Sequence, residues 1–384
     1  MGAVVTRVVV NLLWLVPGVV GGSEESTTDA LRAVADLIAS DRSGGDLDVH
    51  LAVLEQFADA HPDLADRLPI HVLEQDGRDK RRRVLAEQTW LPRLTKDIGA
   101  DVVHHAGGLL PLRHPSRTVL TIHDLQPLDH PGNFRLSKRL YITSMAGRSA
   151  RSADVVTTPS EFTRRRVIDV LGVGADRVVV VPWWVPEPST AEGASRFPLP
   201  SLLGDDPFVL YPAITYPHKN HLVLLDAFAL VAQRRPELRL VLTGGAAASE
   251  ARVLERMGRP DLVGRVLRTG RVPAAQLESL FASAAVVAIP SSYEGFGLPV
   301  LEAMVRGVPV LAAAAGSLPE VARPTDLVAV DDVSAWAAAL DDVLDEPAPV
   351  RAARIAAGRE RAATFTPERC AVALTDAYRR AADG

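Results

Sequence analysis

Short apolar segments alternate along the chain with longer segments in which apolar residues recur every three or four positions. The first kind predicts buried β-strands and the second predicts amphipathic helices. Their alternation is typical of parallel α/β sheets. Strands are predicted at 6–11, 49–54, 101–104, 118–122, 154–157 and 177–181, and then at 208–211, 239–242, 265–269, 285–289 and 309–312. Helices are predicted at 27–40, 84–98, 137–150, 162–171, 219–232 and 273–284, with a last helical segment at 352–382.

This alternation is interrupted between residues 182 and 206, where prolines cluster and no regular element fits easily. A chain of 384 residues is also longer than one hydrophobic core usually supports. We therefore predict a first domain at 1–182, a linker at 183–206, a second domain at 207–362 and a C-terminal helix at 363–384. Thr366 and Pro367 suit the N-cap and the first position of that helix.

A glycine-bearing turn follows the strand predicted at 285–289. Gly295 and Gly297 let backbone amides approach a ligand closely, and Pro299 suits the first turn of a helix, where its missing N–H costs nothing. A strand, a glycine turn and a helix N-terminus together form an anion site, most naturally for phosphate.

Two carboxylates flank this turn. Glu294 lies before it, and Glu302 lies about one turn into the predicted helix, with its side chain leaning back toward the N-terminus. Carboxylates repel phosphate, so we expect them to bind neutral hydroxyls on either side of it. A ligand with hydroxyls on both sides of a diphosphate is a nucleotide-sugar. The alternative is that this strand–turn–helix pattern serves packing alone.

Two glutamates separated by seven residues around a glycine-rich turn resemble the signature of the retaining glycosyltransferases of family 4. The resemblance implies the GT-B fold, in which two Rossmann-like α/β domains face each other across a cleft and the final helix packs back on the first domain. It also implies that Glu294 contacts the transferred hexose and that Glu302 holds the ribose of the donor. The donor is then expected to lie against the backbone of Gly295, Phe296, Gly297 and Leu298.

A lysine follows the strand predicted at 208–211. Lys219 stands near the carboxyl end of that strand and at the start of the next predicted helix, where open α/β sheets bind ligands. In the family that the chain resembles, a lysine here binds the donor diphosphate and stabilises the leaving group. Many members carry an arginine a few residues earlier, and residues 213–215 hold no such cation. A solvated loop lysine is the alternative.

A histidine ends the strand predicted at 118–122. Taken alone, such a histidine is more often structural than functional. The resemblance implies that His123 lies close to the transferred sugar, where it orients a hydroxyl or supports charge in the transition state. Asp124 either fixes the tautomer of His123 or caps the following turn.

Glycines also follow the first predicted strand, with the spacing G-x-x-G-G from Gly18 to Gly22. This is not the dinucleotide spacing G-x-G-x-x-G, so a nicotinamide site is weakly supported. The resemblance implies that the backbone of Gly21 and Gly22 approaches the donor phosphates and the acceptor. The alternative is a tight structural turn.

Composition describes an ordinary globular chain, with 47% hydrophobic and 23% charged residues. A net charge of -5 gives no general attraction to nucleic acid, and we predict no nucleic-acid partner. The single cysteine, Cys370, excludes an intramolecular disulfide framework and a cysteine-based metal site. The apolar opening at 8–20 is too short to span a bilayer and lacks the features of a signal peptide. We therefore expect a soluble, cytoplasmic protein.

No metal and no cofactor are predicted. The spacing Asp46-Leu47-Asp48 matches a metal-binding Asp-x-Asp, but it precedes the strand at 49–54. It therefore lies at the amino end of that strand, away from the edge where ligands bind.

Basic residues cluster at 78–83 and 164–166. They are interpreted either as solvated helix faces or as a contact with an anionic membrane, because many relatives glycosylate lipid-linked acceptors.

The function expected from these residues is metal-independent transfer of a hexose to a hydroxyl acceptor, which in some relatives is lipid-linked. The stretches 213–220 and 123–127 look most like mannosyltransferase relatives, which favours GDP-mannose as the donor. Two alternatives stay open. One is a sugar-nucleotide epimerase of the same fold, and the other is a partner that binds nucleotide-sugar without transferring it.

Overall fold

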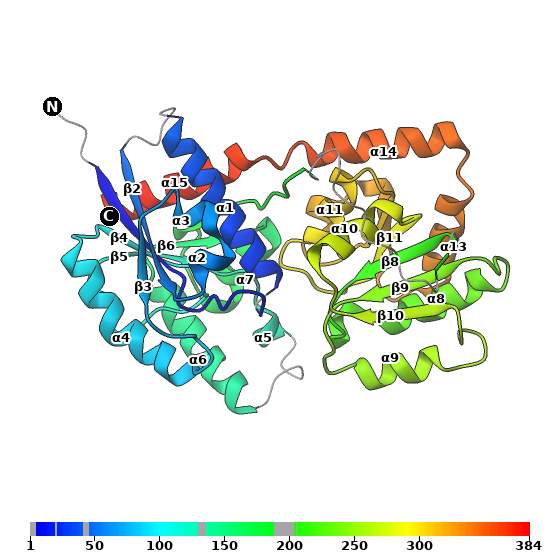
Figure 1. Ribbon diagram of the computed structural model, residues 1–384, viewed down its shortest axis with the longest axis horizontal. Helices are drawn as coiled ribbons and strands as arrows, with labels where there is room; N and C mark the ends of the chain where they lie inside the picture. The colour runs from blue at the N-terminus through cyan, green and yellow to red at the C-terminus, as the bar shows by residue number, and fades with distance from the viewer. Residues whose placement is uncertain (1–4, 20, 41–45, 130–135, 188–202, 205) are drawn as a thin grey trace. The chain divides into compact units, whose positions relative to one another are not determined.

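The computed structural model describes residues 5–384 except 20, 41–45, 130–135, 188–202 and 205 (Figure 1). Most of the linker predicted at 183–206 lies outside these residues. The chain divides into two compact units, one formed by Met1–Trp184 with Phe365–Gly384 and the other by Val185–Thr364. Among the described residues, no helix is long and apolar enough to cross a membrane.

The first unit contains a parallel sheet with the order β3-β2-β1-β4-β5-β6-β7. The strands are β1 (Thr6–Asn11), β2 (Leu47–Leu54), β3 (Ile70–Leu73), β4 (Val102–His105), β5 (Arg117–Thr121), β6 (Val155–Thr158) and β7 (Val178–Val180). Val8, Val9 and Val10 of β1 are fully buried, as expected for a strand covered on both faces. The strand order reverses between β1 and β4, and the carboxyl ends at such a point form a ligand crevice in α/β sheets.

Helices from both ends of the chain cover this sheet (Figure 1). They are α1 (Gly22–Ala39), α2 (Phe57–Ala60), α3 (Pro62–Ala65), α4 (Lys80–Asp97), α5 (Gln126–Asp129), α6 (Leu136–Ser152), α7 (Glu161–Leu171) and α15 (Pro367–Asp383). The last of them, α15, packs beside α1 and on β4, β5 and β6. Its buried residues Cys370, Leu374, Ala377 and Tyr378 recur at helical spacing and belong to the core of the first unit.

The second unit repeats the architecture with the strand order β10-β9-β8-β11-β12-β13. Its strands are β8 (Phe208–Pro212), β9 (Arg239–Thr243), β10 (Val266–Gly270), β11 (Val286–Ile289), β12 (Val310–Ala313) and β13 (Leu327–Val328). Its helices are α8 (His221–Ala232), α9 (Glu250–Met257), α10 (Ala274–Ser283), α11 (Leu298–Val305), α12 (Leu318–Val321), α13 (Val333–Leu344) and α14 (Ala348–Ala362). The order reverses between β8 and β11, so these two strands mark the candidate ligand crevice of this unit.

The predicted class of fold, two Rossmann-like α/β units with parallel sheets, is confirmed. Two edge strands, β3 and β13, were not predicted, because β3 is only partly buried and carries a histidine, and β13 has only two residues. The helical pattern predicted at 352–382 corresponds to two helices, α14 and α15, and the second begins at the predicted helix start. Thr366 causes the break, because its side chain accepts from the backbone N–H of Arg369 at 3.2 Å and so caps a new helix, with Pro367 in the first turn as predicted.

Candidate active site

The loop after β8 carries Lys219, and its backbone determines where this side chain leaves the chain. Pro217–Lys219 form a 3-10 turn, and Asn220 then adopts a left-handed φ of 51°. Asparagine is one of the few residues with a Cβ that adopt this conformation readily. The helix predicted from residue 219 therefore begins two residues later, at His221, and Lys219 lies in the loop.

Lys219 and Glu294 form a bidentate ion pair in the second unit. Lys219 Nζ donates to Glu294 Oε1 at 2.7 Å and to Oε2 at 2.8 Å. The side chains are only 20% and 13% exposed, so water screens the pair incompletely. One residue follows β8 and the other follows β11, the two strands between which the sheet order reverses. The structure thus brings together two residues that were assigned separately from the sequence.

The helix that follows Glu294 begins behind a left-handed glycine. Gly297 is the N-cap of α11 with a φ of 108°, and a Cβ at this position would lie 2.8 Å from Leu318 Cδ2. Both observations explain why the turn carries glycine there. Glu302 is half-buried on α11, whose N-terminus carries the positive end of the helix dipole. Phe296 is buried in the core, so a ligand would meet its backbone rather than its ring.

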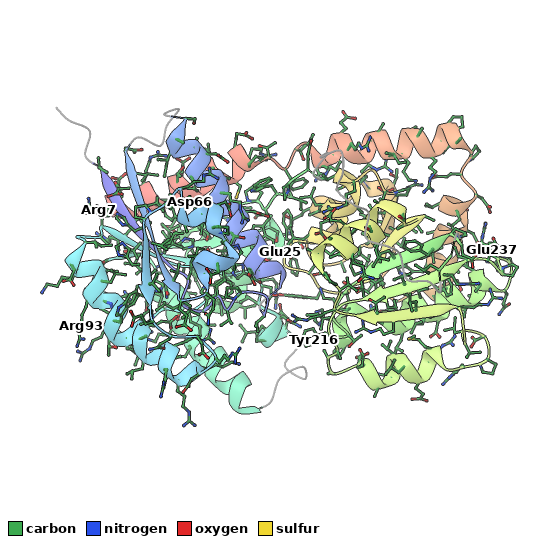
Figure 2. The ribbon with its side chains drawn as sticks, viewed as in Figure 1. Arg7, Glu25, Asp66, Arg93, Tyr216 and Glu237 are labelled. Carbon is green, nitrogen blue, oxygen red and sulfur yellow. The ribbon has the colours of Figure 1, made fainter. Side chains whose placement is uncertain are left out.

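A cavity of about 550 Å³ lies against the loops that follow β8, β9 and β10. Its lining includes Tyr216, which is labelled in Figure 2, together with Glu250 and Arg268. Gly244 allows the chain to turn here, because its φ is 126° and a Cβ would lie 2.4 Å from the carbonyl oxygen of Ala213. This cavity was not predicted from the sequence. The signal was present, since two glycines directly follow β9, and β10 itself ends in a glycine.

Two charged groups in this cavity, Glu250 and Arg268, compensate each other. Arg268 donates to Glu250 Oε1 at 3.3 Å and to Oε2 at 3.2 Å, and Thr215 Oγ1 donates to Oε2 at 2.6 Å. Burial alone would raise the pKa of Glu250. The hydrogen bond from Thr215 and the contacts with Arg268 outweigh it, so this pKa lies below its usual value. Arg271 also lines the cavity, so its wall combines this polar network with a further cation.

His123 follows β5 in the first unit, as predicted. Its Nε2–H donates to the carbonyl oxygen of Ala106 at 2.8 Å, which leaves Nδ1 as the acceptor nitrogen of the ring. Burial lowers the pKa of His123 to about 4, so the ring is neutral at pH 7. Nδ1 is buried and has no hydrogen-bond partner among the described residues. Asp124 accepts from the backbone N–H of Gln126 at 3.0 Å, so it caps the turn and the tautomer is fixed by Ala106.

The glycine loop after β1 leads directly into α1. Gly18 and Gly21 have φ values of 74° and 79°, and Gly21 is the N-cap residue of α1, with Gly22 as its first residue. Glu24 Oε2 accepts from the backbone N–H of Gly18 at 2.9 Å and so ties the loop to the helix. A cavity of about 410 Å³ is lined by Ser23 of α1 and by His123, among other residues. The structure therefore places the first turn of α1 and His123 on one cavity.

The two aspartates with metal-binding spacing form ion pairs with arginines. Asp46 accepts from Arg379 at 2.8 Å, and Asp48 accepts from Arg7 at 2.7 Å, at the amino end of β2. Across the part of the chain that the structure describes, no three His, Cys, Asp or Glu side chains gather as a metal ion would need.

Buried histidines make the stability of the protein depend on pH. Burial lowers the pKa of His104 and His105 to about 3 and that of His123 and His221 to about 4. The unfolded chain takes up protons near pH 6.5, whereas the folded chain does not, so stability is complete above about pH 6.5 and falls as pH decreases toward 4. Each histidine contributes a loss of about 1.4 kcal/mol per pH unit in this window.

Urea unfolding at pH 7.5 and pH 5.0 measures this effect, and we expect a clearly lower midpoint at pH 5.0. Equal midpoints at the two values would show that these histidines are protonated in the folded protein.

Two family models match the chain. The model described as Glycosyltransferase Family 4 matches residues 21–187, and the model described as Glycosyl transferases group 1 matches residues 199–361. The O-antigen chain mannosyltransferase B of Escherichia coli is 32% identical over 301 residues, which cover 76% of this chain and 77% of that protein. The D-inositol 3-phosphate glycosyltransferase of Mycolicibacterium paratuberculosis is 36% identical over 221 residues, 56% of this chain and 47% of that protein. The MMP alpha-(1->4)-mannosyltransferase of Mycolicibacterium hassiacum is 32% identical over 224 residues, 56% of this chain and 52% of that protein.

Solved structures of low sequence identity share the fold. Sucrose-phosphate synthase from Thermosynechococcus elongatus has a TM-score of 0.72 and 20% identity, with 97% of this chain and 98% of that chain covered. Anabaena HepE in complex with UDP and glucose has a TM-score of 0.68 and 18% identity, with the same coverage of 97% and 98%. From these matches and the two parallel-sheet units, the chain belongs to glycosyltransferase family 4 and has the GT-B fold.

Proposed function

We propose that this glycosyltransferase moves a hexose, with mannose as the first candidate, from a nucleoside diphosphate sugar to a hydroxyl acceptor in glycan or glycolipid synthesis. The observation that carries the proposal is the ion pair of Lys219 and Glu294 at the point where the second sheet reverses its strand order. A cation and a helix N-terminus suit a diphosphate, and a carboxylate suits sugar hydroxyls. Both kinds of group are therefore present where a nucleotide-sugar needs them.

The residues of the second unit are assigned to different parts of the nucleotide-sugar. Lys219 and the backbone at 295–298 neutralise the diphosphate, Glu294 accepts from hexose hydroxyls, and Glu302 accepts from the ribose. The cavity lined by Tyr216 takes the nucleoside base, since its wall places an aromatic ring beside hydrogen-bonding groups. The absence of a second cation at 213–215 leaves Lys219 and the amides as the groups that carry the diphosphate charge.

The first unit supplies the groups for the transferred sugar and the acceptor. Gly21 and Gly22 at the start of α1 let the backbone approach the phosphates and the acceptor hydroxyl. His123 orients a sugar hydroxyl in this proposal, because it lines the cavity beside the first turn of α1 and its neutral ring keeps Nδ1 as an acceptor.

The transfer is proposed to retain the anomeric configuration through a front-face mechanism. The bond between the anomeric carbon and the diphosphate oxygen breaks, and the acceptor oxygen bonds to the same face of the sugar. The departing diphosphate oxygen takes the acceptor proton, so no protein base is required. Lys219 and the amides that precede α11 stabilise the charge that develops on the diphosphate.

A donor panel tests the proposed function. The names of two relatives as mannosyltransferases support GDP-mannose, and the complex of HepE with UDP and glucose makes UDP-glucose the competitor to include. Release of nucleoside diphosphate that requires an acceptor, with a product of retained configuration by NMR, is the expected result. Conversion of the donor without an acceptor would identify an epimerase. Thermal stabilisation by the donor without any turnover would identify a binding partner.

Transfer is expected to need no divalent metal. The charge that a metal would supply is provided in this proposal by Lys219 and by the N-terminus of α11. After exhaustive treatment with EDTA, the rate should remain within about twofold of the untreated rate, as expected when no metal-bound charge is removed. Loss of activity that Mn²⁺ or Mg²⁺ restores would contradict this site, and a metal-free enzyme with added Ca²⁺ serves as the control for non-specific salt effects.

We also infer that the acceptor side of the first unit contacts anionic membrane through α4 rather than through α7. In α7, Arg164 donates to Glu161 Oε1 at 2.9 Å and to the carbonyl oxygen of Val178 at 3.0 Å, and Arg166 pairs with Asp129. The cations of that run are therefore engaged within the fold.

The surface of α4 differs from that of α7. Arg81 and Arg82 are exposed at its start, although Arg82 Nε lies 3.7 Å from Asp79 Oδ2 in a solvent-exposed pair. Leu85 beside them is 61% exposed, and Arg93 extends outward from the same helix (Figure 2). Exposed cations beside an exposed apolar side chain fit the headgroup region of an anionic bilayer.

Reversing two of these charges should weaken membrane binding. Each cation near an anionic surface contributes about 1 kcal/mol, so Arg81→Glu with Arg82→Glu should lower co-sedimentation with anionic vesicles at least about tenfold. Arg252→Glu with Arg259→Glu, two exposed arginines of the second unit, is the matched control and should leave binding unchanged. Equal losses in both variants would mean that net charge alone drives binding, and absence of binding by the unaltered protein would reject the contact.

A further inference from the structure

Two buried hydroxyl groups hold the backbone of the ion pair. Tyr211 of β8 is 1% exposed, and its hydroxyl donates to the carbonyl oxygen of Lys219 at 2.6 Å. Ser317, which follows β12, is fully buried and donates to the carbonyl oxygen of Glu294 through Oγ at 2.9 Å and through its backbone N–H at 3.3 Å. Each charged residue is therefore anchored at its own main chain by one hydroxyl from a neighbouring strand or loop.

The two loops are also joined to each other. The Tyr211 hydroxyl donates its one hydrogen to the carbonyl oxygen of Lys219. In its contact with Ser291 Oγ at 3.1 Å it is therefore the acceptor. Ser292 donates to the carbonyl oxygen of His218 through its backbone N–H at 2.8 Å and through Oγ at 3.1 Å. These hydrogen bonds therefore join β8 and the loop that carries Lys219 to the two serines that precede Glu294.

The Tyr211 hydroxyl stays protonated, and the backbone beside Ser317 is closely packed. Burial, together with the charge of Glu294, raises the pKa of Tyr211 well above its usual value, so its hydroxyl remains a donor at any working pH. On the other side, Gly316 has a φ of 58°, and a Cβ there would lie 2.9 Å from the backbone nitrogen of Glu294. The chain next to Ser317 therefore packs directly on the backbone that Ser317 holds.

We propose that Tyr211 and Ser317 are positioning residues that fix the Lys219–Glu294 pair for the transferred nucleotide-sugar. Neither hydroxyl bonds to the charged atoms in the structure; each acts on the backbone from which the charged side chain extends. A lysine side chain has four rotatable bonds, so its ammonium group is placed well only when its Cα is fixed. Small errors of placement reduce catalysis strongly, and this is the effect that the anchors prevent. The inference rests on the proposed function of the pair.

A double-mutant cycle separates positioning from simple stabilisation of the fold. Loss of one hydrogen bond by Tyr211→Phe should lower kcat/KM about fivefold to tenfold in the otherwise unaltered enzyme. In the Lys219→Ala background the same change should lower kcat/KM less than about twofold, because the residue through which Tyr211 acts is gone. Ser317→Ala should behave in the same way in the Glu294→Ala background. Equal factors in both backgrounds would overturn the proposal.

Ser279→Ala is the matched control. Ser279 is also buried, lies in the same unit, and donates from Oγ to the carbonyl oxygen of Ala275 at 3.1 Å within α10. Its loss should lower the urea midpoint about as much as Ser317→Ala does, while kcat/KM stays within about twofold, since only a hydrogen bond of ordinary strength is lost. A comparable loss of activity in Ser279→Ala would assign the effect of Ser317→Ala to stability.

The affinity for nucleoside diphosphate, measured by calorimetry in the same variants, separates this inference from the proposed function. If the unaltered enzyme transfers no hexose from any donor, the proposed function fails. Non-additive losses of GDP or UDP affinity between Tyr211→Phe and Lys219→Ala would still support positioning, and additive losses or no binding would overturn it.

Discussion

Replacing Lys219 by alanine is expected to lower kcat/KM about a hundredfold while the protein stays folded. Removing one well-placed group that stabilises transition-state charge typically costs about 3 kcal/mol. The loss has a second component here, because Glu294 then keeps its negative charge beside the departing diphosphate without its lysine partner. Folding should be little affected, since Lys219 lies in a loop and makes its side-chain bonds to Glu294. Steady-state kinetics with the best donor, together with urea unfolding, measures both quantities.

Lys96→Ala is the control for loss of a lysine, because Lys96 is exposed on α4 of the other unit. Lys219→Arg should recover only part of the activity, since a guanidinium has a different shape and cannot place its charge where an ammonium sits. A loss below about threefold in Lys219→Ala, against the hundredfold expected from transition-state charge, would make this residue part of the solvated surface.

The second large effect is expected for Glu294→Gln, with kcat/KM lowered about thirtyfold. A hydrogen bond to a charged group contributes about 1.5–3 kcal/mol, and the amide keeps the shape of the side chain while losing the charge. The variant also releases Lys219 from its ion pair. Affinity for the nucleoside diphosphate alone should therefore be unchanged or tighter, even though transfer is slow. Isothermal calorimetry with the diphosphate, compared with kinetics using the complete donor, gives the two results.

Glu302→Gln provides the contrast for this prediction. A ribose contact is made equally in the ground state and in the transition state, so its loss should weaken donor binding and leave kcat nearly unchanged. Exchange of the two patterns, with Glu302→Gln slow and Glu294→Gln weakly bound, would exchange the roles of the two carboxylates.

The alternation of apolar strands and amphipathic helices was sufficient to predict the α/β class, because parallel strands buried on both faces leave a clear pattern. It also placed Lys219 and Glu294 after the strands that became β8 and β11. Their direct contact was not predictable, since strand order in a sheet depends on long-range pairing that local pattern does not record. The late start of α8 had the same kind of cause, because Asn220 takes a left-handed conformation that helix periodicity cannot reveal.

The hydrogen bonds by which Tyr211 and Ser317 anchor the ion pair could not be predicted from the sequence, for a different reason. Tyr211 was predicted as the last residue of a strand, and nothing in the sequence singled out Ser317. Their importance comes from carbonyl groups of Lys219 and Glu294 that reach them only in the folded unit. A hydrogen bond from a side chain to a distant backbone group has no periodicity and no motif, so only the structure reveals it.

The position of α15 has a consequence for the order of events during synthesis. Cys370, Leu374 and Tyr378 belong to the core that contains β1, and Tyr378 also shares a hydrogen bond of 2.9 Å with His104. During synthesis, residues 1–184 therefore emerge before residues 365–384, which complete their hydrophobic core. The second unit is contiguous and can close earlier. A released chain that ends before residue 367 thus keeps the whole second unit and lacks α15, so the apolar groove for α15 in the first unit is exposed to chaperones.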